Sequence, residues 1–374
     1  MAVSEARAGL ALHPAIYIAC WMFFSNLTIL FNKWLISSAG FPVILAWWHM
    51  TFATLATQAL ARTTTLLDGR HGIDMTGRVY VRAVVPVGIL YSCSMVSSNL
   101  VYLYLGVPFI QMLKATGPVV TLFVGWVWGV EHPTPTTALL YTLLVVGGVL
   151  VASVGEVHFS WPGLACQAGG VVFESLRLVM VQHLVSDAGL RMDPLVGLYY
   201  YAPVCALANL LVSCVSGWGS FEWRHATEVG LGVLLLNSSV AFLLNVSSIL
   251  LTGKTSGLAL VLTGILKSIL LVVAAVALWG TPVAALQLAG YGLALLGLLL
   301  YQSSWSELKT SLLRAASAQR RWPIVVASSL VAALLLVCVW TAARDGIARR
   351  GNGSRQQLSS LTETAVEAER LSRG

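Results

Sequence analysis

The 374-residue chain is too apolar for a water-soluble protein, because 57% of its residues are hydrophobic and only 10% are charged. A soluble domain carries about 25% charged residues, so the composition excludes an ordinary soluble enzyme or nucleic-acid-binding domain. The 22 Lys and Arg outnumber the 15 Asp and Glu and give a net charge of +7. Most of these cations fall in short loops, where they report the orientation of a membrane protein.

Apolar runs long enough to cross a bilayer follow one another along nearly the whole chain. A transmembrane helix needs about 20 apolar residues, and Gly- and Pro-containing breaks such as Gly40-Phe41-Pro42 and Thr281-Pro282 separate the runs. The pattern predicts an all-α polytopic membrane protein with ten spans, at residues 16–38, 43–61, 79–99, 107–130, 137–155, 162–184, 194–215, 228–251, 256–279 and 283–302.

Loop charges predict the orientation of these spans. If residues 1–15 form a cytosolic N-terminal tail, Arg62, Arg78 and Lys254 fall in loops on the cytosolic side. The loops of the other side offer little beyond Arg224. By the positive-inside rule, both ends of the ten-helix bundle are expected in the cytosol.

Two lysines lie deep inside spanning segments. Lys114 occupies the fourth span and Lys267 the ninth, each with apolar residues on both sides. An ionisable group near the middle of a bilayer costs at least about 2.5 kcal/mol and normally faces a polar cavity, so this pair predicts a site for an anionic solute. The alternative is that each lysine extends to the headgroups, and Pro108 and Pro118 could bend the helix of Lys114 toward an interface.

The position of the lysines also predicts an internal duplication, because each is in the fourth span of a set of five. Each lysine span ends in Trp-Gly and is followed by Thr-Pro and a Gly-rich span. Five is odd, so two such sets have opposite orientations, as in transporters built from inverted repeats. Coincidental similarity between apolar helices is the alternative. The predicted repeats are residues 16–155 and 156–302.

Several longer stretches carry a more specific resemblance. They include FNKWL (31–35), SNLVYLYLGVPFIQMLKATGPVV (98–120), FESLRLVMVQHL (173–184), MDPLVGLYYYAPV (192–204) and GKTSGLALVLTGILKSILLVV (253–273). These stretches resemble the nucleotide-sugar and triose-phosphate translocator family, within the drug/metabolite transporter superfamily. The resemblance implies a ten-helix inverted repeat in a Golgi or endoplasmic-reticulum membrane. It also implies exchange of a cytosolic nucleotide sugar for a lumenal nucleoside monophosphate.

Further site residues are expected beside the two lysines. Lys254 and Thr255 are similar to a Lys-Thr pair that marks one group of these transporters, but they also fit a simple loop position. Arg177 lies three residues after Glu174 on one helix face; a structural ion pair is one interpretation, and the resemblance implies a phosphate contact as another. The remaining candidates are Tyr200 and Tyr201, which suit either base stacking or an interfacial belt, and Asn245, an intramembrane amide that needs a partner.

Differences between this sequence and the motifs of known subgroups narrow the range of possible substrates. GDP-mannose is disfavoured because this chain has LYYYAPV (198–204) and TGILK (263–267) where carriers of that solute have other motifs. Ser268 stands where plastid phosphate translocators have an arginine, and this difference disfavours a plastid phosphate translocator. The tyrosine-rich segment looks more like that of UDP-sugar carriers. The leading hypothesis is therefore a nucleotide-sugar antiporter. The alternatives are a sugar-phosphate/phosphate or phosphoenolpyruvate exchanger of an organelle envelope, and a membrane scaffold without transport.

Neither the motifs of enzymes nor those of cofactor sites are found. The chain has no HExxH, GxSxG or Walker sequence, so we expect no covalent chemistry, cofactor or metal. The expected partners are an anionic phosphorylated solute and membrane lipids, without nucleic acid. The sequence leaves both a monomer and a homodimer open.

The C-terminal part departs from the ten-span plan. Residues 323–342 form an uncharged apolar run of bilayer length, and they predict an additional transmembrane helix. A basic cytosolic segment (303–322) precedes it, and a polar tail (343–374) follows. If the run spans, Asn352 lies in the lumen within a glycosylation sequence; if it lies flat, the tail is cytosolic.

Overall fold

The computed structural model describes residues 14–129, 136–157, 159–187, 194–216, 229–251 and 257–302. Within these residues the chain is helical and contains no strand, which confirms the predicted all-α membrane class. The elements are α2 (Pro14–Ala39), α3 (Pro42–Thr63), η1 (Thr65–Gly72), α4 (Gly77–Val79), η2 (Tyr80–Val84), α5 (Val85–Tyr104), α6 (Val107–Lys114), α7 (Gly117–Val127), α8 (Thr136–Val154), α9 (Trp161–Asp187), α10 (Pro194–Ser216), α12 (Leu231–Leu251), α13 (Gly257–Trp279) and α14 (Ala285–Gln302).

Each of the ten predicted spans coincides with a helix or with consecutive helices. Six segments of the described chain are long and apolar enough to cross a membrane, namely Gly77–Tyr104, Val107–Val127, Trp161–Gln182, Leu195–Val215, Leu231–Ser248 and Leu262–Trp279. Shorter apolar stretches lie in α8 and α14. The segments predicted at 303–322, 323–342 and 343–374 lie outside the described residues, as does most of the tail predicted at 1–15, so these assignments stay predictions.

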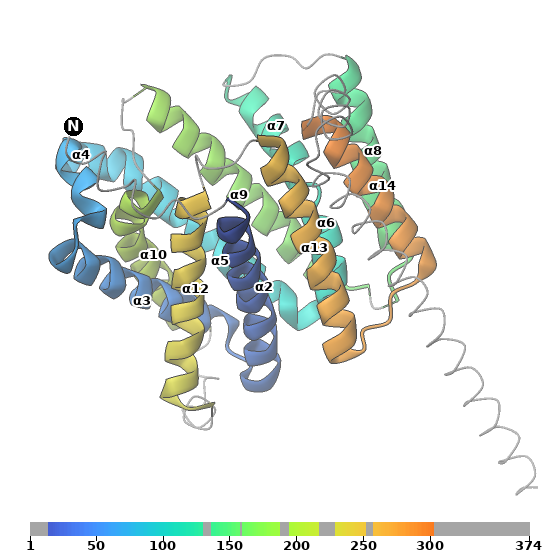
Figure 1. Cartoon of the computed structure of the whole chain (residues 1–374), viewed down its shortest axis with the longest axis horizontal. Helices are drawn as coiled ribbons and strands as arrows, with labels where there is room; N and C mark the ends of the chain where they lie inside the picture. The colour runs from blue at the N-terminus through green and yellow to red at the C-terminus, as the bar shows by residue number, and fades with distance from the viewer. Residues whose placement is uncertain are drawn as a thin grey trace, which may run out of the picture.

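The packing of the helices relates the two sets of five. α3 packs on α10, α6 on α13 and α8 on α14, so the second, fourth and fifth helices each contact their own counterpart. α2 packs on α12 and α9 on α5, so the first helix of each set contacts the third of the other. Figure 1 shows α3 beside α10 at one end of the molecule and α8 beside α14 at the other. This reciprocal pattern is the one that an inverted repeat produces; the repeat boundaries at residues 155 and 156 stay a prediction.

Among the glycines of the described helices, those in α8 and α14 have the least space between their own position and the backbone of another helix. A Cβ added at Gly148 would lie 2.5 Å from the amide nitrogen of Ala294 and 2.7 Å from the carbonyl oxygen of Gly290. A Cβ added at Gly290 would collide in turn with the amide nitrogen of Ala152. Small residues permit such approach between membrane helices, and they explain the Gly-rich pattern shared by the fifth and tenth spans.

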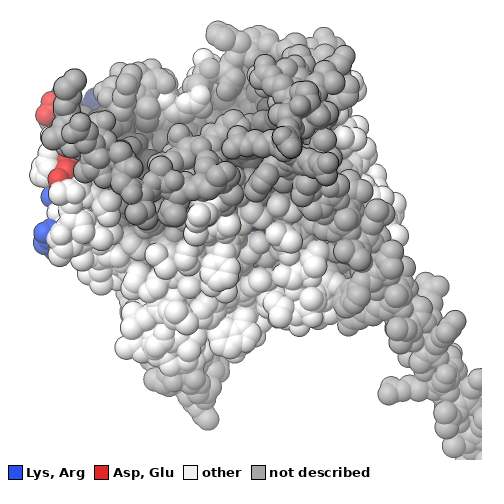
Figure 2. Space-filling view, in the orientation of Figure 1, with Lys and Arg blue, Asp and Glu red and all other residues white. Residues whose placement is uncertain are grey.

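The surface of the described bundle is apolar except near one end. Figure 2 shows charged side chains gathered at the end that holds α4 in Figure 1, while the rest of the described surface on this face is uncharged. The exposed charged residues from the last turn of α3 to the start of α5 include Arg62, Asp68 and Arg78. Leu150, Leu207 and similar side chains are exposed along the helices. An uncharged belt of this kind is what a lipid-facing surface requires.

Candidate functional site

The helix of the fourth predicted span is broken at Lys114. The span predicted at 107–130 is confirmed as one membrane-length segment, Val107–Val127, but within it α6 ends at Lys114 and α7 begins at Gly117. Pro118 has no amide hydrogen to donate to the carbonyl of Lys114, four residues earlier, and its ring clashes with that carbonyl in a regular helix. Thr116 closes the turn instead, as its hydroxyl donates to the carbonyl of Leu113 at 2.7 Å.

A cavity of about 770 Å³ lies beside this break. Its walls come mainly from α5, α7 and α9, and Lys114 is the residue that α6 contributes. Transporter sites commonly form where a membrane helix is discontinuous and irregular backbone borders a cavity. The polar residues of the lining are Tyr91, Ser94, Ser98, Asn99, Lys114, Thr121, Gln167, Glu174, Ser175, Gln182 and Tyr301.

Lys114 is half-buried and lines this cavity. Among the described residues it has no hydrogen-bond partner. Glu174 attracts it electrostatically but does not lie within ion-pair distance of it. The Lys114 ammonium is therefore a charge inside the bundle that no described residue neutralises.

Lys267 extends from α13 toward α2. Its ammonium donates a hydrogen bond of 2.9 Å to the hydroxyl of Ser25 and lies 5.2 Å from the ring centroid of Trp21. Lys114 and Lys267 repel each other electrostatically, and neither has a carboxylate within ion-pair distance in the described part of the chain. Lys267 lines neither of the cavities that Lys114 lines. Two cations inside the bundle without a counter-ion nevertheless favour binding of an anion.

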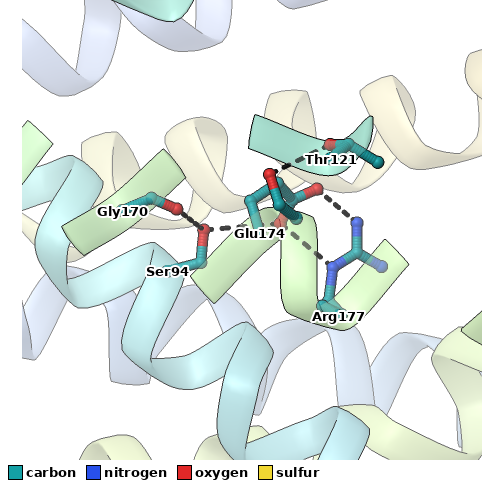
Figure 3. A network of polar contacts seen from close by, with 6 residues as sticks. Ser94, Thr121, Gly170, Glu174 and Arg177 are labelled. Carbon is teal, nitrogen blue, oxygen red and sulfur yellow. Dashed lines mark hydrogen bonds and ion pairs between the residues drawn. The ribbon is translucent and has the colours of Figure 1, made fainter. Parts of the chain in front are cut away.

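A polar network on α9 borders the same cavity. Arg177 forms a bidentate ion pair with Glu174, in which its Nε donates to Oε2 at 3.0 Å and a second nitrogen donates to Oε1. Ser94 of α5 lies 3.3 Å from both the Glu174 carboxylate and the Gly170 carbonyl (Figure 3). Because the two charges neutralise each other, this geometry fits the interpretation of Glu174 and Arg177 as a structural ion pair. Its predicted role as a phosphate contact is not tested.

Arg177 also connects to the tyrosines of α10. Its guanidinium lies 4.8 Å from the ring centroid of Tyr91. Tyr91 in turn meets Tyr201 edge-on, with 5.5 Å between the ring centroids and an interplanar angle of 85°. Tyr201 is thus brought into the same group as Arg177, although Tyr91 rather than Tyr201 lines the cavity.

Tyr200 of α10 lies near the short helical elements that connect α3 to α5. The hydroxyl of Tyr80 donates to the Tyr200 carbonyl at 3.0 Å, and the Tyr200 ring packs edge-on against Tyr199 at 5.2 Å. Arg70 of η1 lies 5.9 Å from the Tyr199 ring. Tyr200 and Tyr201 therefore have different surroundings despite being adjacent in the sequence.

The remaining predicted residues add little to this group. The Asn245 amide donates to the carbonyl of Ala241 in its own helix at 3.0 Å, and Asn245 does not line the larger cavity. Lys254 and Thr255 lie outside the described residues. The roles predicted for these three residues stay predictions.

Two sets of polar residues were not predicted as parts of the site. Gln167, Ser175 and Thr121 line the cavity, and the Thr121 hydroxyl donates to Ser175 at 2.9 Å. A separate buried network joins three helices, because His49 is hydrogen-bonded to Asn237 and the Asn237 amide donates to Asn32 at 2.9 Å. The signal in each case is a polar residue in an apolar span, but its partner on another helix cannot be read from one sequence.

The larger cavity extends toward one end of the bundle. It reaches Gln182 near the end of α9 and Tyr301 near the end of α14. The buried apolar cluster that includes Leu35, Phe41 and Tyr102 packs the end of α2, the start of α3, the end of α5 and α6, and it continues through α8, α13 and α14. The orientation of the ends of α9 and α14 relative to the membrane, predicted from the loop charges, stays a prediction.

The helices and the buried cations define a multi-pass membrane protein of the transporter type. The chain belongs to the Triose-phosphate Transporter family, whose model matches residues 12–302. This match spans both sets of five helices and includes Lys114 and Lys267.

Curated relatives of the chain come from Arabidopsis thaliana. One, named "Probable sugar phosphate/phosphate translocator", is 35% identical over 313 residues, which cover 81% of this chain and 86% of that protein. Another of the same description is 35% identical over 294 residues, covering 76% and 81%. A third is 34% identical over 314 residues, covering 82% and 86%. These names refer to sugar phosphates and phosphate.

Proposed function

We propose that this protein exchanges a phosphorylated sugar for inorganic phosphate across a membrane, without covalent chemistry. The observation that carries the proposal is the pair of half-buried lysines inside the bundle, Lys114 and Lys267, which repel each other and have no carboxylate partner among the described residues. A dianionic phosphoryl group brought between them supplies the missing charge. Its oxygens accept charge-assisted hydrogen bonds from both ammonium groups.

The comparisons favour this substrate class over the nucleotide sugar that leads the sequence analysis. The relatives are named for sugar phosphate and phosphate, which supports the alternative hypothesis. The proposed stacking of a nucleobase on Tyr200 or Tyr201 has little support from the geometry, because neither ring lines the larger cavity. UDP-sugars remain a useful comparison in any uptake screen.

The proposed mechanism is alternating access around the lysines. The cavity extends toward the ends of α9 and α14, while the apolar cluster around Leu35 and Tyr102 packs the other side. We infer that the two sets of five helices rock about the site, so that the cluster opens as the cavity closes. An empty site leaves two repelling cations in the bundle, and this favours return of the carrier with an anion bound and hence obligate exchange.

The membrane in which the protein resides is also a matter of proposal. The sequence predicts a Golgi or endoplasmic-reticulum membrane, and the sugar-phosphate alternative predicts an organelle envelope. A fluorescent tag compared with markers of these membranes distinguishes the two. The scaffold hypothesis predicts correct localisation without exchange.

Counterflow in proteoliposomes tests the proposed function. Vesicles that contain the full-length protein are loaded with unlabelled phosphate, and uptake of labelled phosphate is measured with triose, pentose and hexose phosphates and a UDP-sugar as competitors. We expect uptake that depends on internal phosphate and is inhibited by at least one phosphorylated sugar. Absence of phosphate counterflow, with uptake driven only by a nucleotide, would contradict the proposal.

A further inference from the structure

A second, smaller cavity also borders Lys114. It has a volume of about 310 Å³ and is lined by residues of α6, α7, α13 and α14. Lys114 and Pro118 belong to the walls of both cavities. The helix break thus places Lys114 in the walls of both cavities.

Two hydrogen-bonding groups in the wall of the smaller cavity make no hydrogen bond of normal geometry with the described residues. Gln111 is 5% exposed and Tyr291 is 1% exposed, and both line the cavity. The side-chain amide nitrogen of Gln111 and the hydroxyl of Tyr291 are both unpaired; the Tyr291 hydroxyl faces Ser268 without completing a hydrogen bond. Buried donors without a partner destabilise a fold, so they indicate a place where a ligand or solvent supplies the acceptor.

The rest of the lining suits a small polyol. The Ser268 hydroxyl donates to the Gly264 carbonyl at 3.0 Å, so the Ser268 oxygen can accept from the nearby Tyr291 hydroxyl or from a ligand. Ile265, Leu295 and Leu298 form an apolar wall. A mainly apolar space with a few fixed polar groups is the usual form of a small-molecule site.

We propose that this smaller cavity binds the hydroxyl-bearing part of the substrate, while Lys114 holds the phosphoryl group at its mouth. Gln111 and Tyr291 donate to sugar oxygens, and Ser268 accepts from a sugar hydroxyl. The volume of about 310 Å³ equals that of about ten water molecules at about 30 Å³ each, which accommodates a short carbon chain or a single ring. The assignment rests on the proposed function, since it requires a phosphorylated sugar as substrate.

The two substrates therefore differ in what they need from the site. Inorganic phosphate has no organic part and depends on the lysines alone. A phosphorylated sugar depends in addition on Gln111, Ser268 and Tyr291. Changes in the smaller cavity are expected to alter the preference between the two substrates more than the rate of phosphate exchange.

The test is the ratio of two half-inhibitory concentrations in proteoliposomes, that of a sugar phosphate divided by that of unlabelled phosphate. Tyr291→Phe removes only the hydroxyl, and Gln111→Leu removes the amide at similar volume. Each variant is expected to raise the ratio about five- to tenfold, the effect of one lost hydrogen bond to a ligand. The control is Tyr141→Phe, because Tyr141 of α8 is half-buried and lines neither cavity.

Gly264→Leu provides a second variant that removes no hydrogen bond. A Cβ at Gly264 meets no atom within 4 Å, so the new side chain enters open space in the cavity wall. We expect the ratio to rise more for a hexose phosphate than for a triose phosphate, since the larger sugar needs more of the cavity. A structural effect alone would not depend on substrate size.

The outcomes separate this inference from the proposed function. A wild-type protein that exchanges phosphate and a phosphorylated sugar, with ratios unchanged in all three variants, overturns the subsite and leaves the proposed function in place. A wild-type protein that exchanges neither overturns both. A selective rise of the ratio in Tyr291→Phe and Gln111→Leu, with size dependence in Gly264→Leu, supports the subsite.

Discussion

The ammonium of Lys267 and the hydroxyl of Ser25 join α13 to α2 by a hydrogen bond of 2.9 Å. These helices belong to different sets of five, so the contact crosses the boundary about which the proposed rocking occurs. Serine is neutral and leaves the charge of Lys267 uncompensated. A phosphoryl group that reaches Lys267 competes with Ser25 for the same ammonium, and this links anion binding to the contact between the two sets.

The first prediction is that Lys267→Ala loses exchange and keeps its fold. The side chain has no carboxylate partner among the described residues, so its removal leaves no opposite charge unpaired. Loss of a charge-assisted hydrogen bond to phosphate is expected to lower kcat/KM about 10- to 100-fold. Counterflow and the Tm of the purified protein measure the two effects.

Two further variants serve as controls for this prediction. Lys267→Arg should also be impaired, because a planar guanidinium does not replace a compact ammonium. Ser25→Ala removes the partner of Lys267 and keeps the cation, so exchange should fall less than in Lys267→Ala. Near-normal exchange by well-folded Lys267→Ala protein would rule out the role of Lys267 as a phosphate anchor.

The second prediction concerns the ion pair between Glu174 and Arg177. Glu174→Gln removes the carboxylate, leaves Arg177 without its partner, and is expected to lower the free energy of unfolding by about 1–3 kcal/mol. The same change removes a negative charge that acts on Lys114, so phosphate should bind more tightly. Thermal unfolding and the half-inhibitory concentration of phosphate measure these opposite effects; weaker phosphate binding by folded protein would contradict this interpretation.

The third prediction concerns the break beside Lys114. Pro118→Ala restores an amide that can bond the Lys114 carbonyl, so α6 and α7 can join and redirect the lysine. We expect exchange to fall about tenfold, as small misplacements of a binding group do, without a lower Tm. Pro108→Ala is the matched control, because Pro108 has the same place in the first turn of α6 but follows Gly106, which is extended with ψ 148°, so its amide has no preceding helix to join. Equal exchange by the two variants would show that the break has no role.

The fourth prediction uses two adjacent glycines of α8. A Cβ at Gly148 meets the α14 backbone at 2.5 Å, whereas a Cβ at Gly147 meets nothing within 4 Å. Gly148→Leu is expected to destabilise the fold by about 1–3 kcal/mol or more, and Gly147→Leu should be tolerated. The yield and Tm of the purified variants measure this difference. Similar values for both would contradict the close approach of α8 and α14.

The ten spans and the two lysines could be predicted because each is a local feature of the sequence. A bilayer-length apolar run identifies a span, and a lysine in such a run identifies a buried charge. The helix break after Lys114 could be predicted only in part from the sequence. Pro118 signalled a bend, but the sequence did not show that the bend would end α6 at the lysine itself.

The partners of the site residues could not be predicted, since they come from helices far apart in the sequence. Nothing local to Lys267 indicates Ser25, 242 residues earlier. Tyr200 and Tyr201 were treated alike, yet Tyr201 packs on Tyr91 while the carbonyl of Tyr200 accepts from Tyr80. Gln111 could not be identified as a site residue from the sequence either, because one amide in an apolar span does not show that a cavity lies beside it.

The most direct test of the anion site is an experimental structure of the full-length protein with a saturating concentration of a sugar phosphate. We predict that phosphoryl oxygens lie about 2.7–2.9 Å from the ammonium of Lys114. The Lys267 ammonium is predicted to leave Ser25 and contact the same phosphoryl group. A phosphoryl group bound away from both lysines, with Lys267 still hydrogen-bonded to Ser25, would contradict the account.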